Sequence, residues 1–179
     1  MIELARARAE RFRPGADVRF VAAPVENTRL PDAAFEAVVG KWVLHHSDFP
    51  LAARELARVL VARGRGAFFE NQGLNPLLAL ARRHLVGRGP VGRFGTPDER
   101  PLVRSDFEVL RSAFGHLERE YPNVYFFELL SRQVLGSSGL LALRRVDDLV
   151  WRRAPPVRRW SYHVLLKVEK RTPVSRSPG

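Results

Sequence analysis

The stretch that decides the fold is residues 21–70, VAAPVENTRLPDAAFEAVVGKWVLHHSDFPLAARELARVLVARGRGAFFE. Its first residues complete a short apolar run, 18–23, with the character of a strand. Residues 35–40 (FEAVVG) predict a buried strand, because no polar residue interrupts the Ala-Val-Val run. Residues 49–62 carry apolar side chains at helical spacing with a proline in the first turn, which predicts an amphipathic helix. Residues 66–70 (GAFFE) return to a strand pattern, so the alternation indicates an α/β fold with a largely parallel sheet.

The rest of the chain continues this alternation less regularly. A turn is expected at Arg63-Gly64, between the amphipathic helix and the strand that follows it. Ser105 is the expected cap of a helix over 106–114, with Glu108 at the capping-box position. The other expected elements are helices over 2–12, 74–86 and 139–151, strand-like segments over 116–127, and a final strand over 160–168.

Composition bounds the class of protein. The chain has 179 residues, of which 45% are hydrophobic, and this is enough for one domain with a real core. The absence of cysteine excludes disulfides, zinc fingers and thiol nucleophiles. No apolar run approaches the roughly 20 residues of a membrane span, and charges interrupt the N-terminus too often for a signal peptide. We therefore expect a cytoplasmic protein with a disordered tail over 172–179.

The formal net charge of +11 first suggests anionic partners. Only three of the basic residues are lysines, Lys41, Lys167 and Lys170, and the arginines are spread along the whole chain. Such an arginine bias can follow from genome composition alone. Peripheral contact with an anionic membrane surface stays open as an alternative. No stacking motif or recognition helix supports specific nucleic-acid binding.

Two long motifs follow each other in order, PVENTRLPDAAFEAVVGKWVLHH (24–46) and RELARVLVARGRGAFFE (54–70). They resemble the acidic adenine loop, the L-H-H segment and the R-V-L-K-P-G-G helix end of class I, Rossmann-like S-adenosylmethionine-dependent methyltransferases that act on small molecules. GTPDERPL (95–102), SDFEVLRSAF (105–114) and VLLKVEK (164–170) extend the resemblance over nearly the whole chain. It implies a methyltransferase domain over 1–171 in which residues 87–104 form a substrate-lid-like loop.

The resemblance also implies a cofactor, S-adenosylmethionine, and the residues that would hold it. Ligands of open α/β sheets bind beyond the carboxyl ends of the strands, and both loops in question leave such ends. Val25 and Glu26 would line the adenine edge. The other implied cofactor-binding residues follow the second and fourth strands of the family's sheet: Met1, Ile2, Gly40, Lys41, Trp42 and His45.

The sequence departs from the family pattern in three places. Pro24 stands where the family has an adenine-contacting aspartate, and Arg63-Gly64 where it has a glycine pair. Met1 aligns just after the family's second strand. We therefore expect a three-layer Rossmann-like sheet that is incomplete, without the first two strands and the glycine-rich loop, and with an antiparallel last strand. The functional alternatives are a methyltransferase, or a non-catalytic remnant or binding subunit.

His45 has three interpretations. Together with His46 and Asp48 it could suggest a metal site, but adjacent histidines in an extended segment point to opposite faces, so we expect no metal. It could instead be a general base, since some methyl acceptors must lose a proton. The favoured interpretation is that both histidines finish the strand and contact core or cofactor.

Two further groups of residues invite a functional interpretation. Trp151 and Arg158 flank a Pro-Pro turn and could meet a membrane or a phosphorylated substrate. The favoured interpretation is that arginines extend around core tryptophans. Asp147-Asp148 looks like a carboxylate pair, but neighbouring helix positions do not face each other, so a solvated face or a cap is expected.

Overall fold

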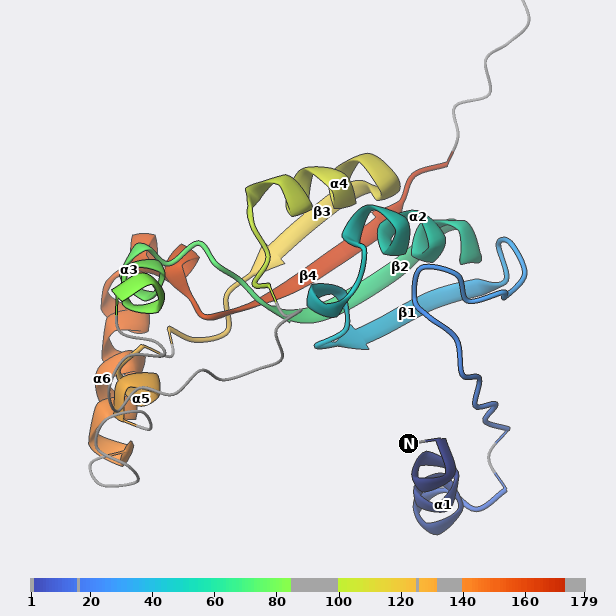
Figure 1. Ribbon diagram of the computed structural model, residues 1–179, viewed down its shortest axis with the longest axis horizontal. Coiled ribbons are helices and arrows are strands. Elements are labelled where there is room, and N and C mark those ends of the chain that lie inside the picture. The colour runs from blue at the N-terminus through green and yellow to red at the C-terminus, as the bar shows by residue number, and fades with distance from the viewer. Residues whose placement is uncertain (1, 16, 85–99, 125, 132–139, 173–179) are drawn as a thin grey trace, which may run out of the picture.

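A computed structural model describes residues 2–15, 17–84, 100–124, 126–131 and 140–172 (Figure 1). In these residues one four-stranded sheet has the order β1-β2-β4-β3. The strands are β1 (Phe35–Lys41), β2 (Leu60–Asn71), β3 (Gly115–Glu120) and β4 (His163–Lys170). β1 pairs parallel with β2, whereas β4 runs antiparallel to both β2 and β3. The α/β class and the antiparallel last strand are confirmed, and the described sheet is mixed rather than largely parallel.

The helices differ in how they meet the sheet. The described elements are α1 (Ile2–Phe12), η1 (Leu44–His46), α2 (Phe49–Val59), α3 (Pro76–His84), α4 (Arg104–Phe114), α5 (Phe127–Leu130), α6 (Leu140–Arg153) and η3 (Pro155–Trp160). α2 and α4 pack against each other and cover one face of the sheet, whereas α1 stands apart from it (Figure 1). α1 has no buried residue.

The core lies between this helical pair and the sheet. Phe107, Leu110 and Phe114 follow each other at helical spacing along α4 and are buried. The other members of the core are Leu44, Phe49, Ala52, Ala53, Leu56, Ala57, Leu60, Phe68, Leu102, Val164, Leu166 and Val168. Because strand residues alternate between faces, Phe69 and Leu165 belong to the opposite face, where they are only partly buried. We call this the open face, and the described residues thus show two of the three expected layers.

Two strand expectations were wrong in detail. Residues 18–23 form no strand, because among the described residues no neighbouring strand supplies the hydrogen bonds that an extended segment needs. The strand at 35–40 exists but is not buried, since β1 lies at the sheet edge and Val39 is 84% exposed. An edge position leaves one side of the strand without a partner.

The boundaries of the central elements also differ from expectation. α2 ends at Val59, and β2 begins at Leu60 without an intervening turn. Arg63, where a turn was expected, lies inside β2 with a φ of 63°, and the pairing register with β1 shifts between Phe35 and Ala37. The left-handed conformation of Arg63 therefore produces an irregularity within the strand and does not end it.

The N-cap residue of α4 is Val103 rather than the expected Ser105. Asp106, at the third position of the helix, accepts a hydrogen bond from the Val103 amide at 2.8 Å and so takes the capping-box role expected for Glu108. Glu108 pairs with Arg111 instead. A carboxylate in the first turn of a helix is also stabilised by the helix dipole.

Gly66, at the centre of β2, provides a test of the packing. A Cβ atom there would lie 2.7 Å from Val168 Cγ2 and 3.2 Å from Val38 Cγ2. We expect Gly66→Ala to destabilise the fold by about 1–3 kcal/mol through overpacking, measured by urea unfolding. Gly73→Ala, whose added carbon would meet its nearest atom at 3.4 Å, is the matched control and should cost clearly less. Equal effects of the two substitutions would contradict the packing described.

Candidate functional site

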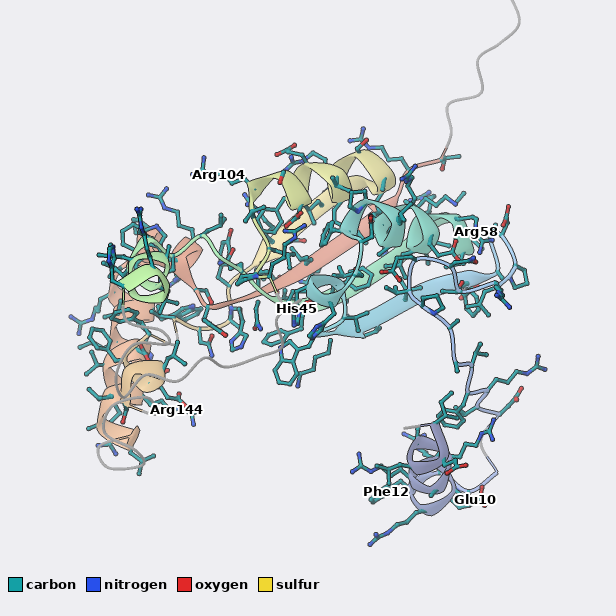
Figure 2. The ribbon with its side chains drawn as sticks, in the orientation of Figure 1. Glu10, Phe12, His45, Arg58, Arg104 and Arg144 are labelled. Carbon is teal, nitrogen blue, oxygen red and sulfur yellow. The ribbon has the colours of Figure 1, made fainter. Side chains whose placement is uncertain are left out.

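The candidate site lies where β1 and β2 end. Because the two strands are parallel, their carboxyl ends meet at one edge of the sheet. Lys41 closes β1, Trp42 follows it, and η1 brings His45 back over the end of β2 (Figure 2). The described part of the chain holds no group of three or more histidine, aspartate or glutamate side chains arranged for a metal ion.

Glu70 fixes this turn of chain. Its side chain is fully buried, and Oε1 accepts the amide hydrogens of Val43 at 2.9 Å and Leu44 at 3.0 Å. Its Oε2 lies 2.6 Å from His45 Nδ1, and with a carboxylate as partner Nδ1 carries the hydrogen. Buried carboxylates need such partners, so Glu70 holds η1 in place.

Sequence reasoning missed Glu70. The available signal was a single acidic residue that ends the apolar run GAFFE, beside the L-H-H segment. His45 lies in η1 rather than at the end of β1, so the expectation that it finishes the strand was wrong. Its side chain is only 4% exposed, which fits the expected contact with the core.

Lys41 and Trp42 lie on the solvent side of the same edge. Trp42 is 48% exposed and has a φ of 55°, a conformation that bulky residues rarely adopt, and its amide donates to Phe69 O at 2.9 Å. Lys41 Nζ lies 4.3 Å from the centre of the Trp42 ring, a cation–π contact. Strained backbone held by its surroundings is a recurring feature of functional sites.

An aromatic row continues from Trp42 across the open face. The Phe69 ring centre lies 6.5 Å from that of Trp42 and 4.9 Å from that of His163, on which it stacks. Burial, and secondarily the charge of Lys41, lowers the pKa of His163 from its ordinary value. The imidazole therefore favours its neutral form, in which it resembles the neighbouring rings.

The loop over residues 24–34 is tied to the same region. Glu26 Oε1 accepts the Asp48 amide hydrogen at 2.9 Å, which joins the loop directly to the segment after η1. Thr28 donates to Glu55 Oε1 from its backbone amide at 2.8 Å and from its hydroxyl. The Arg58 guanidinium bonded to Glu55 lowers the pKa of that carboxyl from 4.5 to about 2, although burial acts in the opposite direction.

The segment that begins at Arg100 returns to this region. Leu102 forms an isolated bridge with Gln72, and the Arg100 amide donates to His45 O at 3.4 Å. Arg100 also pairs with Asp106 through two hydrogen bonds of 2.8 and 2.9 Å, and this contact raises the pKa of the guanidinium. Of the expected lid over 87–104, residues 87–99 lie outside the described residues.

The expected cofactor-binding residues fall into two groups. Glu26, Gly40, Lys41, Trp42 and His45 lie on segments that meet at the ends of β1 and β2, and Val25 packs beside them against the core. Ile2 begins α1, which stands apart from the sheet (Figure 1). Met1 lies outside the described residues.

The two remaining groups of residues have structural partners. Asp147 is buried, and its carboxylate accepts the amide hydrogens of Phe126, Phe127 and Glu128 at 2.8–3.0 Å. It therefore caps the amino terminus of α5, in agreement with the expected cap. The Arg158 guanidinium lies 4.1 Å from the centre of the Trp151 ring, in agreement with arginines that extend around tryptophans.

Comparison with known proteins agrees with this geometry. Residues 1–68 match the family model described as "Methyltransferase domain". No curated protein matches the sequence. Among solved structures, the chain is similar to YcgJ from Bacillus subtilis, with 21% identity over 96% of this chain and 79% of that one and a TM-score of 0.57.

Two further similar structures are longer than this chain. The [4+2]-cyclase SpnF shares 21% identity over 96% of this chain and 63% of its own, with a TM-score of 0.55. Geranyl diphosphate C-methyltransferase from Streptomyces coelicolor was solved with Mg²⁺, geranyl diphosphate and S-adenosyl-L-homocysteine. It shares 12% sequence identity over 96% of this chain and 59% of its own, with a TM-score of 0.57. The chain thus spans about three fifths of these two proteins.

These findings agree with the fold and leave the activity as a proposal. Residues 1–68 match a methyltransferase family model, and nearly the whole chain is similar in fold to solved structures that include methyltransferases. The fold expected from the sequence resemblance is thereby confirmed. Among the described residues, no helix combines the length and the apolar character needed to cross a bilayer.

Glu70→Ala tests the role assigned to the buried carboxylate. It leaves two buried amides and one imidazole without their acceptor, so we expect a loss of about 3 kcal/mol in the free energy of unfolding. Amide hydrogen exchange at Val43 and Leu44 should accelerate. Glu70→Gln keeps one acceptor oxygen and should cost less. Unchanged exchange at both amides in Glu70→Ala would contradict the assignment.

The Glu55–Arg58 pair predicts a pH dependence. A carboxyl with a lowered folded-state pKa contributes stability above its unfolded pKa, and this contribution is lost as the pH falls from about 4.5 towards 2. The difference in stability between the unaltered chain and Glu55→Gln should therefore be constant above about pH 5 and shrink below it. Thermal unfolding at several pH values measures this difference.

In an Arg58→Met background the main cause of the lowered pKa is removed, so the pH-dependent part of the difference should largely disappear. A difference that is the same at about pH 3 and pH 7 in the unaltered chain would contradict the account.

Proposed function

We propose that the chain is an S-adenosylmethionine-dependent methyltransferase that acts on a small organic molecule. The observation that carries the proposal is the Glu26–Asp48 hydrogen bond, which joins the loop over 24–34 to the segment after β1. The resemblance assigns these two segments to the adenine and the methionine parts of one cofactor. In this structure they are one connected wall at the carboxyl end of the sheet, where ligands of such folds bind.

The charged side chains at this wall, Glu26 and Lys41, suggest which parts of the cofactor each would contact. One oxygen of Glu26 holds Asp48, and the other has no partner among the described residues, so it is available to a hydroxyl or amino group of the cofactor. The Lys41 ammonium would repel the sulfonium centre and suits the cofactor's carboxylate instead. Val25, Gly40, Trp42 and His45 complete the proposed contact set. For Ile2 to join it, with Met1, α1 would have to pack against the sheet.

The proposed chemistry asks little of the protein beyond placement. The cofactor supplies the methyl group, and the main task of the chain is to align the acceptor with it. If the acceptor must lose a proton, His45 is the candidate base, because it is the imidazole that Glu70 orients through Nδ1 at the end of β2. Its deep burial makes a positioning role the first expectation.

The wider proposal follows from the same assignment. Residues 1–171 act as one methyltransferase domain in the cytoplasm, with the segment 87–104 covering the acceptor. The Arg100–Asp106 pair supports this role, because it anchors the end of that segment beside His45.

Calorimetric titration with S-adenosylhomocysteine tests the proposal. We expect saturable, micromolar binding, and a loss of about tenfold (~1.4 kcal/mol) in Trp42→Ala, which removes the exposed ring and its contacts with Lys41 and Phe69. Val18→Ala, at an exposed position in the loop before the sheet, is the matched control and should bind normally. Absence of heat at millimolar ligand, from a chain shown to be folded by circular dichroism, would contradict the proposal for this polypeptide.

A further inference from the structure

A hollow lies on the open face, away from the proposed cofactor wall. It is a cavity of about 380 Å³ between the end of β3, α6, η3 and β4. Its lining residues are Glu120, Tyr121, Pro122, Trp151, Arg158 and Leu165. A volume of this order lies in the range of small-molecule sites.

The register of the sheet places the cavity relative to the candidate site. Lys41 pairs with Phe69, Phe69 with Leu165, and Leu165 with Glu120. Neighbouring strands lie about 4.8 Å apart. The cavity at Leu165 is therefore about two strand spacings from Lys41, on the same face but separated from it by Phe69.

The walls of the cavity are mainly apolar, and two of their polar side chains have partners in the protein. The Trp151 indole donates its N–H to Tyr121 O at 2.9 Å, which fixes the ring as a flat wall. Glu120, the one acidic residue at the rim, pairs with Lys167. Leu165 and Pro122 contribute only carbon side chains.

Arg158 supplies one oriented cation. Its Nε donates to Trp151 O at 2.8 Å, and its guanidinium carbon lies 4.1 Å from the Trp151 ring centre. Among the described residues no carboxylate pairs with it, so the N–H groups of its two terminal nitrogens can donate hydrogen bonds to a ligand. A stacked guanidinium held in this way is suited to bidentate recognition of a carboxylate.

We propose that this cavity binds an amphipathic organic carboxylate, with a flat apolar body against Trp151 and Leu165 and its carboxylate on Arg158. The site is separate from the proposed cofactor wall and does not depend on methyl transfer. The ligand class follows from a cation that no carboxylate of the described residues pairs, in a mainly apolar hollow whose acidic residue, Glu120, already pairs with Lys167.

The probes are 2-naphthoate and its methyl ester, which share the ring system and differ in charge. Calorimetry should show the acid binding at least about tenfold more tightly than the ester. In Arg158→Met, which keeps an unbranched apolar side chain and removes the charge, this preference should disappear while the ester binds as before. Arg158→Lys keeps the charge without the fork and should retain part of the preference.

Arg104→Met is the matched control, because Arg104 is an exposed arginine on α4, at the helical face of the sheet (Figure 2). It should leave both affinities unchanged, and circular dichroism confirms that each variant is folded. Acid and ester that bind equally, or an acid preference that survives Arg158→Met, would overturn the proposal. So would competition between 2-naphthoate and S-adenosylhomocysteine. Failure of S-adenosylhomocysteine to bind at all would affect only the proposed function, since the acid is titrated alone.

Discussion

The arrangement of the candidate site depends on the buried carboxylate of Glu70. A carboxylate removed from water must find hydrogen-bond donors in the protein, and Glu70 finds them in two backbone amides and the His45 ring. These donors come from the segment that directly follows β1. Because β2 is an inner strand of the sheet and carries Glu70 near its end, the position of that segment is fixed relative to the centre of the sheet. The same contacts fix the positions of Lys41 and Trp42, because these residues directly precede the segment that Glu70 holds.

The open face connects the two sites that the structure suggests. Lys41, Phe69, Leu165 and Glu120 form one row across all four described strands. At one end of the row lies the proposed cofactor wall, and at the other lies the cavity with Trp151 and Arg158. Both ends combine a cation with an aromatic ring, but their partners differ, since Lys41 lies over an exposed ring and Arg158 is held by a backbone carbonyl. The fold alone does not select a reaction, as the similar fold of a cyclase shows.

Local pattern was sufficient to predict most elements. The spacing of apolar residues predicted α2, α4 and the strands β1, β2 and β4, because periodicity is a property of neighbouring residues. It was insufficient where the outcome depends on distant partners. Residues 18–23 have the composition of a strand and no neighbour to pair with, and Val39 has the composition of a core residue at a sheet edge.

The site shows the same division. The resemblance brought Glu26, Gly40, Lys41, Trp42 and His45 forward as a set, and the structure brings their segments together. Contacts between residues far apart in sequence were not predictable from local pattern, such as Glu70 with Val43 or Thr28 with Glu55, each 27 residues apart. A single acidic residue at the end of an apolar run does not indicate which backbone amides will donate hydrogen bonds to it.

The most direct test of the central claim is amide hydrogen exchange across the whole chain with and without S-adenosylhomocysteine. The account predicts that the ligand slows exchange in two separate segments, residues 24–28 and 40–46, while the helical face formed by α2 and α4 stays unchanged. Protection confined to other parts of the chain, with ligand binding established independently, would show that the cofactor wall is not where the ligand binds.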